Sequence, residues 1–270
     1  MPGGYTRKND LFMFPFIHIG HFSIGTFGIM LWLAAVCAWW ILQKNFRRSR
    51  IEADAAGVVL VATVAGIIGA KLWHVMDTPG EHLFQREGFA WFGGLLAGIL
   101  ALLWEGRVNR TGGLAMLDFA APAAAVGYGV GRLGCLTSGD GDYGIPTNLP
   151  WGMSFPNGLV PTLPGQRVHP TPIYELLASL VIAWIVWRRG ATRKPVGEIT
   201  GEYLVLTGLA RFLVEFIRIN PPIFHGMTNA QLASLGSVAA GILLIVWAQR
   251  RAASAAPDAR SPVEQAQPQP

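Results

Sequence analysis

Long apolar stretches separated by short polar connections run through most of the chain. A helix needs roughly 17–25 mostly apolar residues to cross a bilayer, and these stretches approach or reach that length. Inside hydrocarbon every backbone polar group must be paired within its segment, so the stretches predict helices. They lack the alternation of apolar and polar positions that marks the strands of a membrane barrel. The pattern predicts an all-α, polytopic membrane bundle of about seven transmembrane helices, near residues 23–43, 57–76, 88–104, 114–134, 173–187, 201–219 and 230–248.

The composition agrees with a membrane protein: 51% of the residues are hydrophobic and 14% are charged, whereas about a quarter of the residues in soluble domains are charged. The net charge of +5 would by itself allow a nucleic-acid partner. The basic residues, however, gather after the first, third, fifth and seventh predicted spans, and the sequence has no zinc finger, P-loop or RNA-binding signature. The positive-inside rule then places the amino terminus outside and the carboxyl terminus in the cytoplasm. We therefore predict contact with membrane lipid and no nucleic-acid partner.

We interpret residues 1–251 as one membrane-embedded domain and residues 252–270 as a disordered cytoplasmic tail, because the tail is rich in Ala, Pro, Ser and Gln. The longest external connection, residues 135–172, joins the fourth and fifth spans. It is rich in glycine and proline but also contains aromatic residues. Aromatic side chains favour the membrane interface, so we expect this connection to form short helices and turns there.

Two arginines lie within or at the end of apolar stretches, where charges are expensive. Arg132 ends the fourth stretch, and Arg211 lies inside the sixth. Glu215 follows Arg211 by four residues and Arg218 follows Glu215 by three, so all three share one helical face. One interpretation is a structural ion pair between Arg211 and Glu215. The other is an anion clamp, because guanidinium groups bind phosphate bidentately and stay charged. Near the outer surface, such a clamp suits a phospholipid headgroup.

The segment 127–144, GYGVGRLGCLTSGDGDYG, adds glycines and acidic residues to Arg132. Glycines such as Gly131 and Gly134 let backbone approach a ligand closely and supply amide donors. Asp140 and Asp142 add acceptors or a base, unless the segment is a plain solvated turn. Cys135 is either a thiolate stabilised by Arg132 or a passive small residue. The chain's two cysteines are not expected to pair, and no residues have metal-ligand spacing, so we predict no metal and no cofactor.

The segment 168–175, VHPTPIYE, predicts the start of the fifth helix. Thr171 is the expected N-cap and Pro172 the first helical residue. His169 would lie just before the helix, and Tyr174 and Glu175 in its first turns. A histidine there either caps the helix or works in a site as an acid or base, because an imidazole titrates near neutral pH.

Several of these motifs, in this order, resemble the prolipoprotein diacylglyceryl transferases, bacterial membrane enzymes. The resemblance covers nearly the whole chain and rests on FGGLLAG at 92–98, LDFAAP at 117–122, GRLG at 131–134, HPTPIYE at 169–175, ARFLVEFIR at 210–218 and MTNAQLASL at 227–235. It implies transfer of a diacylglyceryl group from phosphatidylglycerol to the lipobox cysteine of prolipoprotein signal peptides, at the outer leaflet of the bacterial plasma (inner) membrane.

The resemblance also implies roles for individual residues. Arg132 and Arg211 match the essential arginines of the family, and His169 is our candidate base, so these three are the predicted catalytic residues. Predicted substrate-binding residues, besides the two arginines, are Gly93, Gly94, Gly131, Gly134, Cys135, Ser138, Asp140, Tyr174, Glu175 and Glu215; Asp118 also matches a family position. The sequence departs from the family where Phe92 replaces a histidine often cast as the base, where Cys135 and Ser138 replace asparagines, where Asp140 replaces a glutamate and where Phe27 replaces a tyrosine. These departures affect the handling of the proton more than the holding of phosphate.

Three hypotheses follow from the sequence. The leading one is a diacylglyceryl transferase that acts on a lipobox thiol. The second is a related lipid transferase that uses Cys135 as a nucleophile in a covalent lipid intermediate. The third is a phospholipid-binding paralogue that has lost turnover, as the replacement at Phe92 suggests. A transporter is disfavoured, because the sequence has no internal repeat and no pair of interrupted helices in matching halves.

Overall fold

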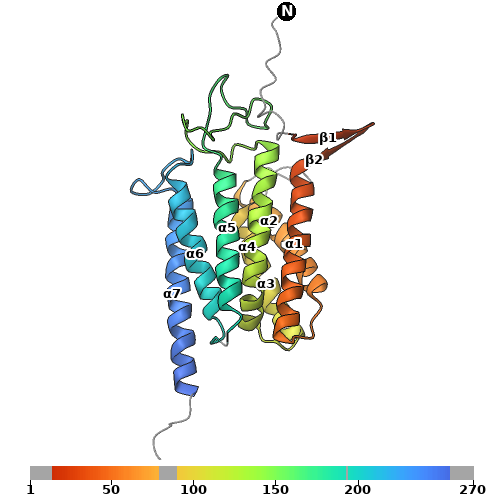
Figure 1. Cartoon of the computed structure of the whole chain (residues 1–270), viewed down its shortest axis with the longest axis vertical. Coiled ribbons are helices and arrows are strands. Elements are labelled where there is room, and N and C mark those ends of the chain that lie inside the picture. The colour runs from red at the N-terminus through yellow and green to blue at the C-terminus, as the bar shows by residue number, and fades with distance from the viewer. Residues whose placement is uncertain (1–13, 79–89, 193, 256–270) are drawn as a thin grey trace, which may run out of the picture.

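The computed structural model describes residues 14–78, 90–192 and 194–255, which form seven helices and one two-stranded sheet (Figure 1). The helices are α1 (Thr26–Ser49), α2 (Ala55–Asp77), α3 (Trp91–Val108), α4 (Gly113–Ser138), α5 (Thr171–Arg189), α6 (Glu198–Glu215) and α7 (Asn229–Ala255). Each overlaps one of the seven predicted stretches, so the predicted helical membrane bundle is confirmed. Five of them, α1, α2, α4, α5 and α7, are long and apolar enough to cross a membrane.

Within the described chain, the 18-residue helices α3 and α6 are not among those five. For α6 the reason is its charge: it contains Glu198, Glu202, Arg211 and Glu215. The sixth predicted stretch therefore forms a helix of the bundle, but one that carries charged residues in both its halves.

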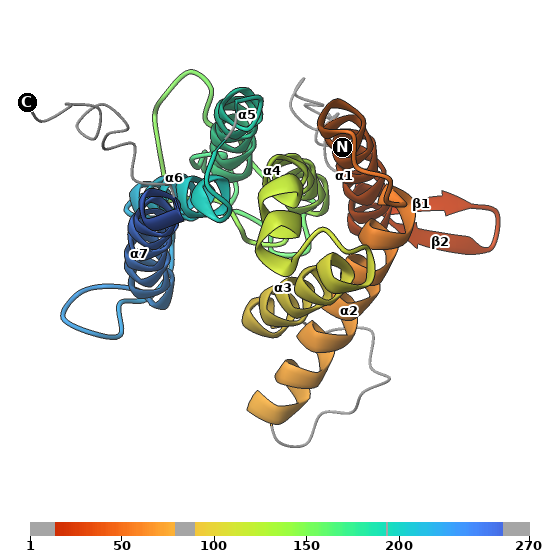
Figure 2. The same cartoon turned by 90° about the horizontal axis from the view of Figure 1, so that it is seen from below.

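Helix α4 lies at the centre of the bundle and packs against α1, α3, α5 and α6 (Figure 2). Its small residues allow the close approach: a Cβ on Gly129 would lie 3.1 Å from the Cβ of Ser179 in α5. Helices α2 and α3 approach even more closely, because a Cβ on Gly93 would lie 2.2 Å from the carbonyl oxygen of Gly69. Helix α7 packs on α6 at the edge of the bundle.

Asp118 of α4 ties α4 to the beginning of α6. Its carboxylate accepts hydrogen bonds from the backbone N–H groups of Gly197 (2.6 Å) and Thr200 (2.8 Å), and from the Thr200 hydroxyl (2.6 Å). The first N–H groups of a helix have no partner within the helix. Asp118 thus acts as an N-terminal cap that comes from a different helix.

A β-hairpin precedes α1 and was not predicted from the sequence. Strands β1 (Phe16–Ile19) and β2 (Phe22–Gly25) pair in antiparallel fashion, with Phe16 opposite Gly25. The hairpin projects sideways from the end of the bundle where the α4–α5 connection lies (Figure 1). The predicted first span began at residue 23, but α1 begins at Thr26 because residues 23–25 are part of the hairpin.

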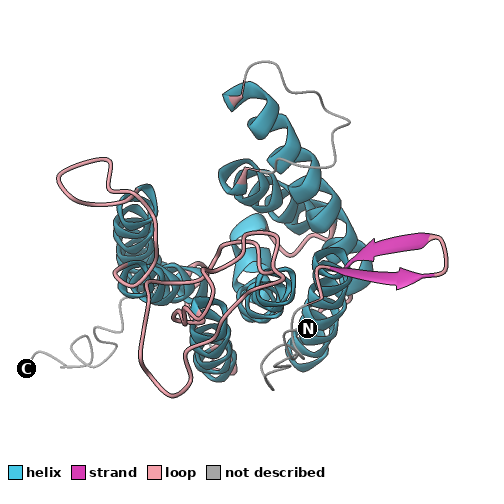
Figure 3. Ribbon diagram, turned by 90° about the horizontal axis from the view of Figure 1, so that it is seen from above, coloured by secondary structure: helices cyan, strands magenta, loops and turns pink. Residues whose placement is uncertain are grey.

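The connection between α4 and α5 covers the ends of the central helices (Figure 3). Helix α4 continues past the predicted end at residue 134 to Ser138, and Gly139 then ends it with a left-handed conformation, φ +57°. Instead of the short helices that we expected, residues 139–170 form turns and isolated bridges, such as Pro146 with Val168. The connection packs on α4 through a buried cluster of Leu136, Tyr143, Phe155 and Val168.

Helix α7 continues to Ala255, so the first four residues of the predicted tail 252–270 are helical. The rest of that tail lies outside the described residues.

Candidate active site

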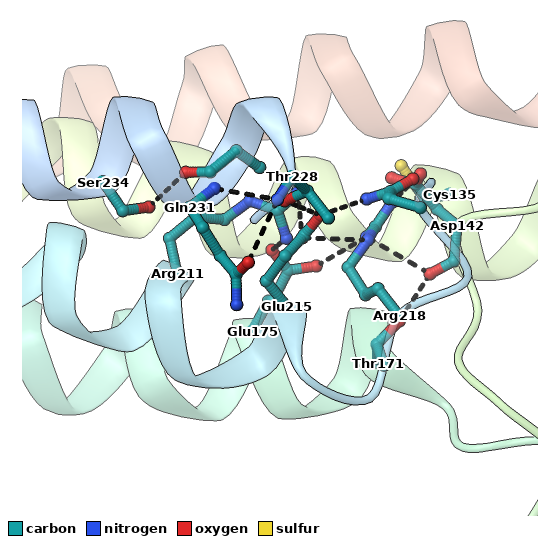
Figure 4. Close-up of polar contacts among 12 residues, drawn as sticks. Cys135, Asp142, Thr171, Glu175, Arg211, Glu215, Arg218, Thr228, Gln231 and Ser234 are labelled. Carbon is teal, nitrogen blue, oxygen red and sulfur yellow. Dashed lines mark hydrogen bonds and ion pairs between the residues drawn. The ribbon is translucent and has the colours of Figure 1, made fainter. Parts of the chain in front are cut away.

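Three arginines and three carboxylates meet beneath the α4–α5 connection, at the end of the bundle where the hairpin lies (Figure 4). We call this group the arginine cluster. Its members come from four segments of the chain: Arg132 from α4, Asp142 from the connection, Glu175 from α5, and Arg211, Glu215 and Arg218 from α6 and the turn that follows it. The three positive and three negative formal charges balance.

Glu175 is the centre of the cluster. Its Oε1 atom accepts a hydrogen bond from the Tyr128 hydroxyl (2.6 Å) and lies 3.2 Å from Arg132 Nη2 and 3.3 Å from Arg211 Nη1. Its Oε2 atom lies 3.4 Å from Arg218 Nη1. The Glu175 side chain is only 5% exposed. One buried carboxylate therefore contacts all three guanidinium groups and fixes their relative positions.

Glu215 fixes the cluster from the side of α6 and α7. Its Oε2 atom lies 2.9 Å from Arg211 Nη2, so the predicted ion pair between these two residues is present. Its Oε1 atom accepts hydrogen bonds from Asn220 Nδ2 (2.5 Å) and the Thr228 hydroxyl (2.8 Å). Thr228 and Gln231 bond reciprocally to each other's backbone N–H at the beginning of α7, as in a capping box. The start of α7 is thereby joined to the arginine cluster.

Asp142 bridges two arginines on the more exposed side of the cluster. One of its carboxylate oxygens contacts Arg132 and the other contacts Arg218. Burial would raise the pKa of Asp142, but the charges of Arg218 and Arg132 outweigh it and hold that pKa below its usual range. Asp142 therefore stays ionised as the partner of the two arginines.

Asp140, two residues earlier, forms no ion pair with Arg132 among the described residues; Asp142 forms it. Substrate binding by Asp140 stays a prediction. The Asp140 carboxylate turns back and accepts a hydrogen bond from the Asp142 backbone N–H (3.1 Å). Such local turns are typical of aspartate, and Gly141 between them has φ +92°. Burial raises the pKa of Asp140, and the nearby charge of Asp142 raises it further. The two aspartates, two residues apart, therefore differ in both position and acidity.

Cys135 lies between cationic and anionic groups. Its sulfur is 3.7 Å from Arg132 Nη1. The same sulfur and one carboxylate oxygen each of Asp140 and Asp142 lie within 4.8 Å of one another. These three atoms have metal-ligand chemistry, but both Asp142 oxygens already contact arginines, so we assign them no metal. The thiol does not have a purely positive surrounding, contrary to the thiolate interpretation of the sequence.

His169 forms a separate group with two aromatic residues. Its Nδ1 atom lies 3.2 Å from the Tyr174 hydroxyl oxygen, and that oxygen accepts a hydrogen bond from Trp151 Nε1 (2.8 Å). No hydrogen bond or ion pair joins His169 to the arginine cluster among the residues that the structure describes. Thr171 is not the N-cap that we predicted: α5 begins at Thr171 itself, and its hydroxyl donates to the backbone carbonyl of Asp142 (2.6 Å).

The small residues of the predicted site have different surroundings. Nothing lies within 4 Å of a Cβ placed on Gly131, so the backbone there borders open space. Gly134 packs against Phe27 and Met30 of α1, and the Ser138 hydroxyl bonds to the Gly134 carbonyl (2.7 Å) inside α4. Gly93 and Gly94 pack against α2. Substrate binding by these residues stays a prediction.

The structure thus brings together Arg132, Arg211, Glu175 and Glu215, as predicted. It adds Arg218, Tyr128 and Asp142, which were not among the predicted site residues. The spacing of Arg218 from Glu215 was a usable signal, since the two side chains still lie 3.7 Å apart although α6 ends at Glu215.

The cluster has the chemistry of a site for a phosphate anion. Arg132 is 14% exposed and Arg218 7% exposed, and the Nε atom of each is buried without a hydrogen-bond partner. The Nε atom of Arg218 lies 3.7 Å from Glu215 Oε2, which is an ion contact but not a hydrogen bond. Desolvated arginines of this kind bind phosphate strongly because they have already lost most of their hydration and are held in place before the anion arrives.

Comparisons with known proteins agree with this geometry. The prolipoprotein diacylglyceryl transferase family matches residues 15–247. The chain is similar to the phosphatidylglycerol–prolipoprotein diacylglyceryl transferase of Cupriavidus metallidurans, with 29% identity over 90% of this chain and 96% of the relative. It is 30% identical to the proteins of the same description from Chromohalobacter salexigens, over 87% of this chain and 92% of the relative, and from Geobacter sulfurreducens, over 87% and 95%. A match that spans most of the chain, on a helical membrane bundle with buried arginines, shows that the chain belongs to the prolipoprotein diacylglyceryl transferase family.

Proposed function

We propose that this membrane enzyme binds the phosphate of phosphatidylglycerol at the arginine cluster and transfers the diacylglyceryl group to the lipobox cysteine of a prolipoprotein signal peptide. The observation that carries this assignment of residues is the meeting of Arg132, Arg211 and Arg218 around Glu175. Cations this deep in a membrane bundle need a partner or a ligand. An anionic lipid headgroup supplies that ligand while its acyl chains stay in the bilayer.

The reaction increases the charge on the phosphate. The lipobox sulfur attacks the glycerol carbon that carries the phosphate ester, so a sulfur–carbon bond forms as the carbon–oxygen bond breaks. Glycerol phosphate leaves with the electron pair of the broken bond, and its phosphate changes from one negative charge to two. Fixed guanidinium groups stabilise the leaving group more than the bound substrate, which is the condition for catalysis by electrostatic stabilisation.

The thiol must lose its proton before or during the attack. A thiol with an ordinary pKa of roughly 8.5 is mostly protonated at neutral pH. His169 is our candidate acceptor for this proton, and its hydrogen bond with Tyr174 would orient the ring. In this proposal the lipobox cysteine enters between the arginine cluster and the group formed by His169 and Tyr174.

We place the site at the outer leaflet of the bacterial plasma (inner) membrane. The arginine cluster lies at the end of the bundle that holds the α4–α5 connection (Figure 1). Basic residues that end α1 and α5, such as Arg47 and Arg189, belong to the opposite end. The positive-inside rule assigns that opposite end to the cytoplasm.

The test is incubation of the purified protein with phosphatidylglycerol and a lipobox peptide, followed by mass spectrometry. We expect the peptide to gain the mass of one diacylglyceryl group and glycerol phosphate to be released in equal amount. A peptide whose lipobox cysteine is replaced by serine is the matched control and should stay unmodified. Folded protein that yields no product on the cysteine peptide, in several lipid compositions, would refute the proposed reaction.

A further inference from the structure

The arginine cluster already contains an anion of its own at the place where a lipid phosphate would bind. Asp142 contacts Arg132 through one oxygen and Arg218 through the other. A carboxylate and a phosphodiester each have one negative charge and two strong acceptor oxygens. Asp142 therefore has the charge and the acceptor number of the headgroup for which the two arginines would serve.

The charge balance of the cluster means that Asp142 and a bound phosphate would compete for the same arginines. Three arginines face three carboxylates, so a further anion would leave the buried cluster with an excess negative charge. Desolvated groups tolerate such an excess poorly. For the phosphate to bind without it, one carboxylate must give up its arginine contacts.

Burial identifies Asp142 as that carboxylate. The Asp142 side chain is 30% exposed, whereas that of Glu175 is 5% exposed and that of Glu215 is fully buried. Glu175 and Glu215 also accept hydrogen bonds from Tyr128 and Thr228, which would lose their partners if either carboxylate moved. Of the three carboxylates, Asp142 would lose the least burial and the fewest other side-chain contacts if water replaced its two arginine contacts.

The contacts of the Asp142 backbone show what would move. The Asp142 carbonyl accepts hydrogen bonds from the Thr171 hydroxyl (2.6 Å) and Arg218 Nη1 (3.5 Å), and its N–H donates to Asp140 (3.1 Å). These bonds hold the main chain in place. Displacement therefore requires rotation of one side chain and no rearrangement of the connection.

We propose that Asp142 is a displaceable internal counterion: it neutralises Arg132 and Arg218 in the empty site and leaves them when the phosphate of an anionic lipid binds. This inference rests on the proposed function, because it takes the lipid phosphate as the competing anion. The apparent affinity for the lipid is the intrinsic affinity multiplied by the fraction of molecules in which the arginines are free of Asp142, so the competition lowers it. In return, the empty site has no uncompensated buried arginines.

Lipid binding by two matched variants tests the proposal. Asp142→Asn removes the charge that contacts Arg132 and Arg218, whereas Glu202→Gln removes a carboxylate charge that pairs with Arg189 at the opposite end of the bundle. The full chain in uncharged detergent is titrated with phosphatidylglycerol, and with diacylglycerol as the lipid that lacks phosphate. We expect Asp142→Asn to bind phosphatidylglycerol about tenfold more tightly, Glu202→Gln to change affinity less than about threefold, and neither to change diacylglycerol binding. Equal effects of both substitutions, or weaker phosphatidylglycerol binding by Asp142→Asn, would overturn the proposal.

A second measurement uses the unmodified protein, so it does not depend on the folding of a variant. A water-soluble carbodiimide and an amine nucleophile label accessible carboxylates, and peptide mass spectrometry locates the label. Phosphatidylglycerol should increase the labelling of Asp142 severalfold and leave Glu175 unlabelled. Unchanged or decreased labelling of Asp142 at saturating lipid would count against displacement. Neither measurement contains an acceptor peptide, so a protein that binds the lipid but transfers nothing would contradict the proposed reaction and leave this inference intact.

Discussion

Among the single carboxylate-to-amide substitutions proposed for this protein, Glu175→Gln should destabilise the fold most. Glutamine has nearly the same shape, and its oxygen can still accept the bond from Tyr128. The negative charge, however, is lost from the point where Arg132, Arg211 and Arg218 meet at 3.2–3.4 Å. Three partly buried cations would then share the two remaining carboxylates.

The size of the effect follows from these distances. One ion contact at 3.3 Å has a Coulomb energy of about 5 kcal/mol at an effective dielectric constant of about 20. Desolvation offsets much of this, and removal of one partner from a buried pair typically costs about 3–5 kcal/mol. Since glutamine keeps an acceptor oxygen, we expect the lower end of that range, about 3 kcal/mol. For a chain of this size that corresponds to a fall in melting temperature of roughly 6–12 °C.

Thermal unfolding of the purified protein in detergent measures this change. Glu202→Gln is the matched control, because Glu202 pairs with Arg189, whose side chain is 48% exposed. An exposed pair contributes about 0–1 kcal/mol, so the control should melt within a few degrees of the unmodified protein. If Glu175→Gln melts as Glu202→Gln does, the cluster is hydrated enough to tolerate uncompensated charge, and our account of its energetics is wrong.

Three further substitutions test the assigned roles by the rate of peptide lipidation. Arg211→Lys should fold but lipidate the peptide about a hundredfold more slowly. The reason is that one ammonium group cannot contact both Glu175 and Glu215 as the guanidinium does. A near-normal rate would mean that only the charge of Arg211 matters. His169→Gln should reduce the lipidation rate at least tenfold at pH 6.5 but little at pH 9, where the substrate thiol ionises unaided. A pH profile like that of the unmodified enzyme would mean that His169 accepts no proton and only contacts Tyr174. Cys135→Ser should keep the rate within about threefold, because the acceptor thiol comes from the substrate; loss of turnover in a folded variant would favour the covalent alternative.

Local sequence relationships predicted part of the site well. The pair Arg211 and Glu215 is four residues apart in a helix, so its contact follows from helical geometry. Arg132 was identifiable because an apolar stretch seldom contains a charge without a reason. The seven helices follow from the lengths of the apolar stretches, which depend on bilayer thickness rather than on tertiary structure.

Relationships that depend on tertiary structure were not predictable. That Glu175 would contact three arginines depends on how α4, α5 and α6 pack. The choice between Asp140 and Asp142 depends on the backbone turn at Gly141, where φ is +92°. The hairpin was missed because each strand has only four residues and residues 23–25 were assigned to the first predicted span.

The cap that Asp118 provides has a consequence for a site at the other end of the bundle. Helix α6 is a stiff rod, and Arg211 lies about three turns, or roughly 16 Å, beyond Thr200 along its axis. By bonding Gly197 and Thr200, Asp118 sets both the height and the angular phase of that rod. A slip at the capped end would turn the far end by the same angle and aim the Arg211 guanidinium away from Glu175. The alignment of the proposed phosphate site is thus decided in part by a carboxylate at the opposite end of the bundle.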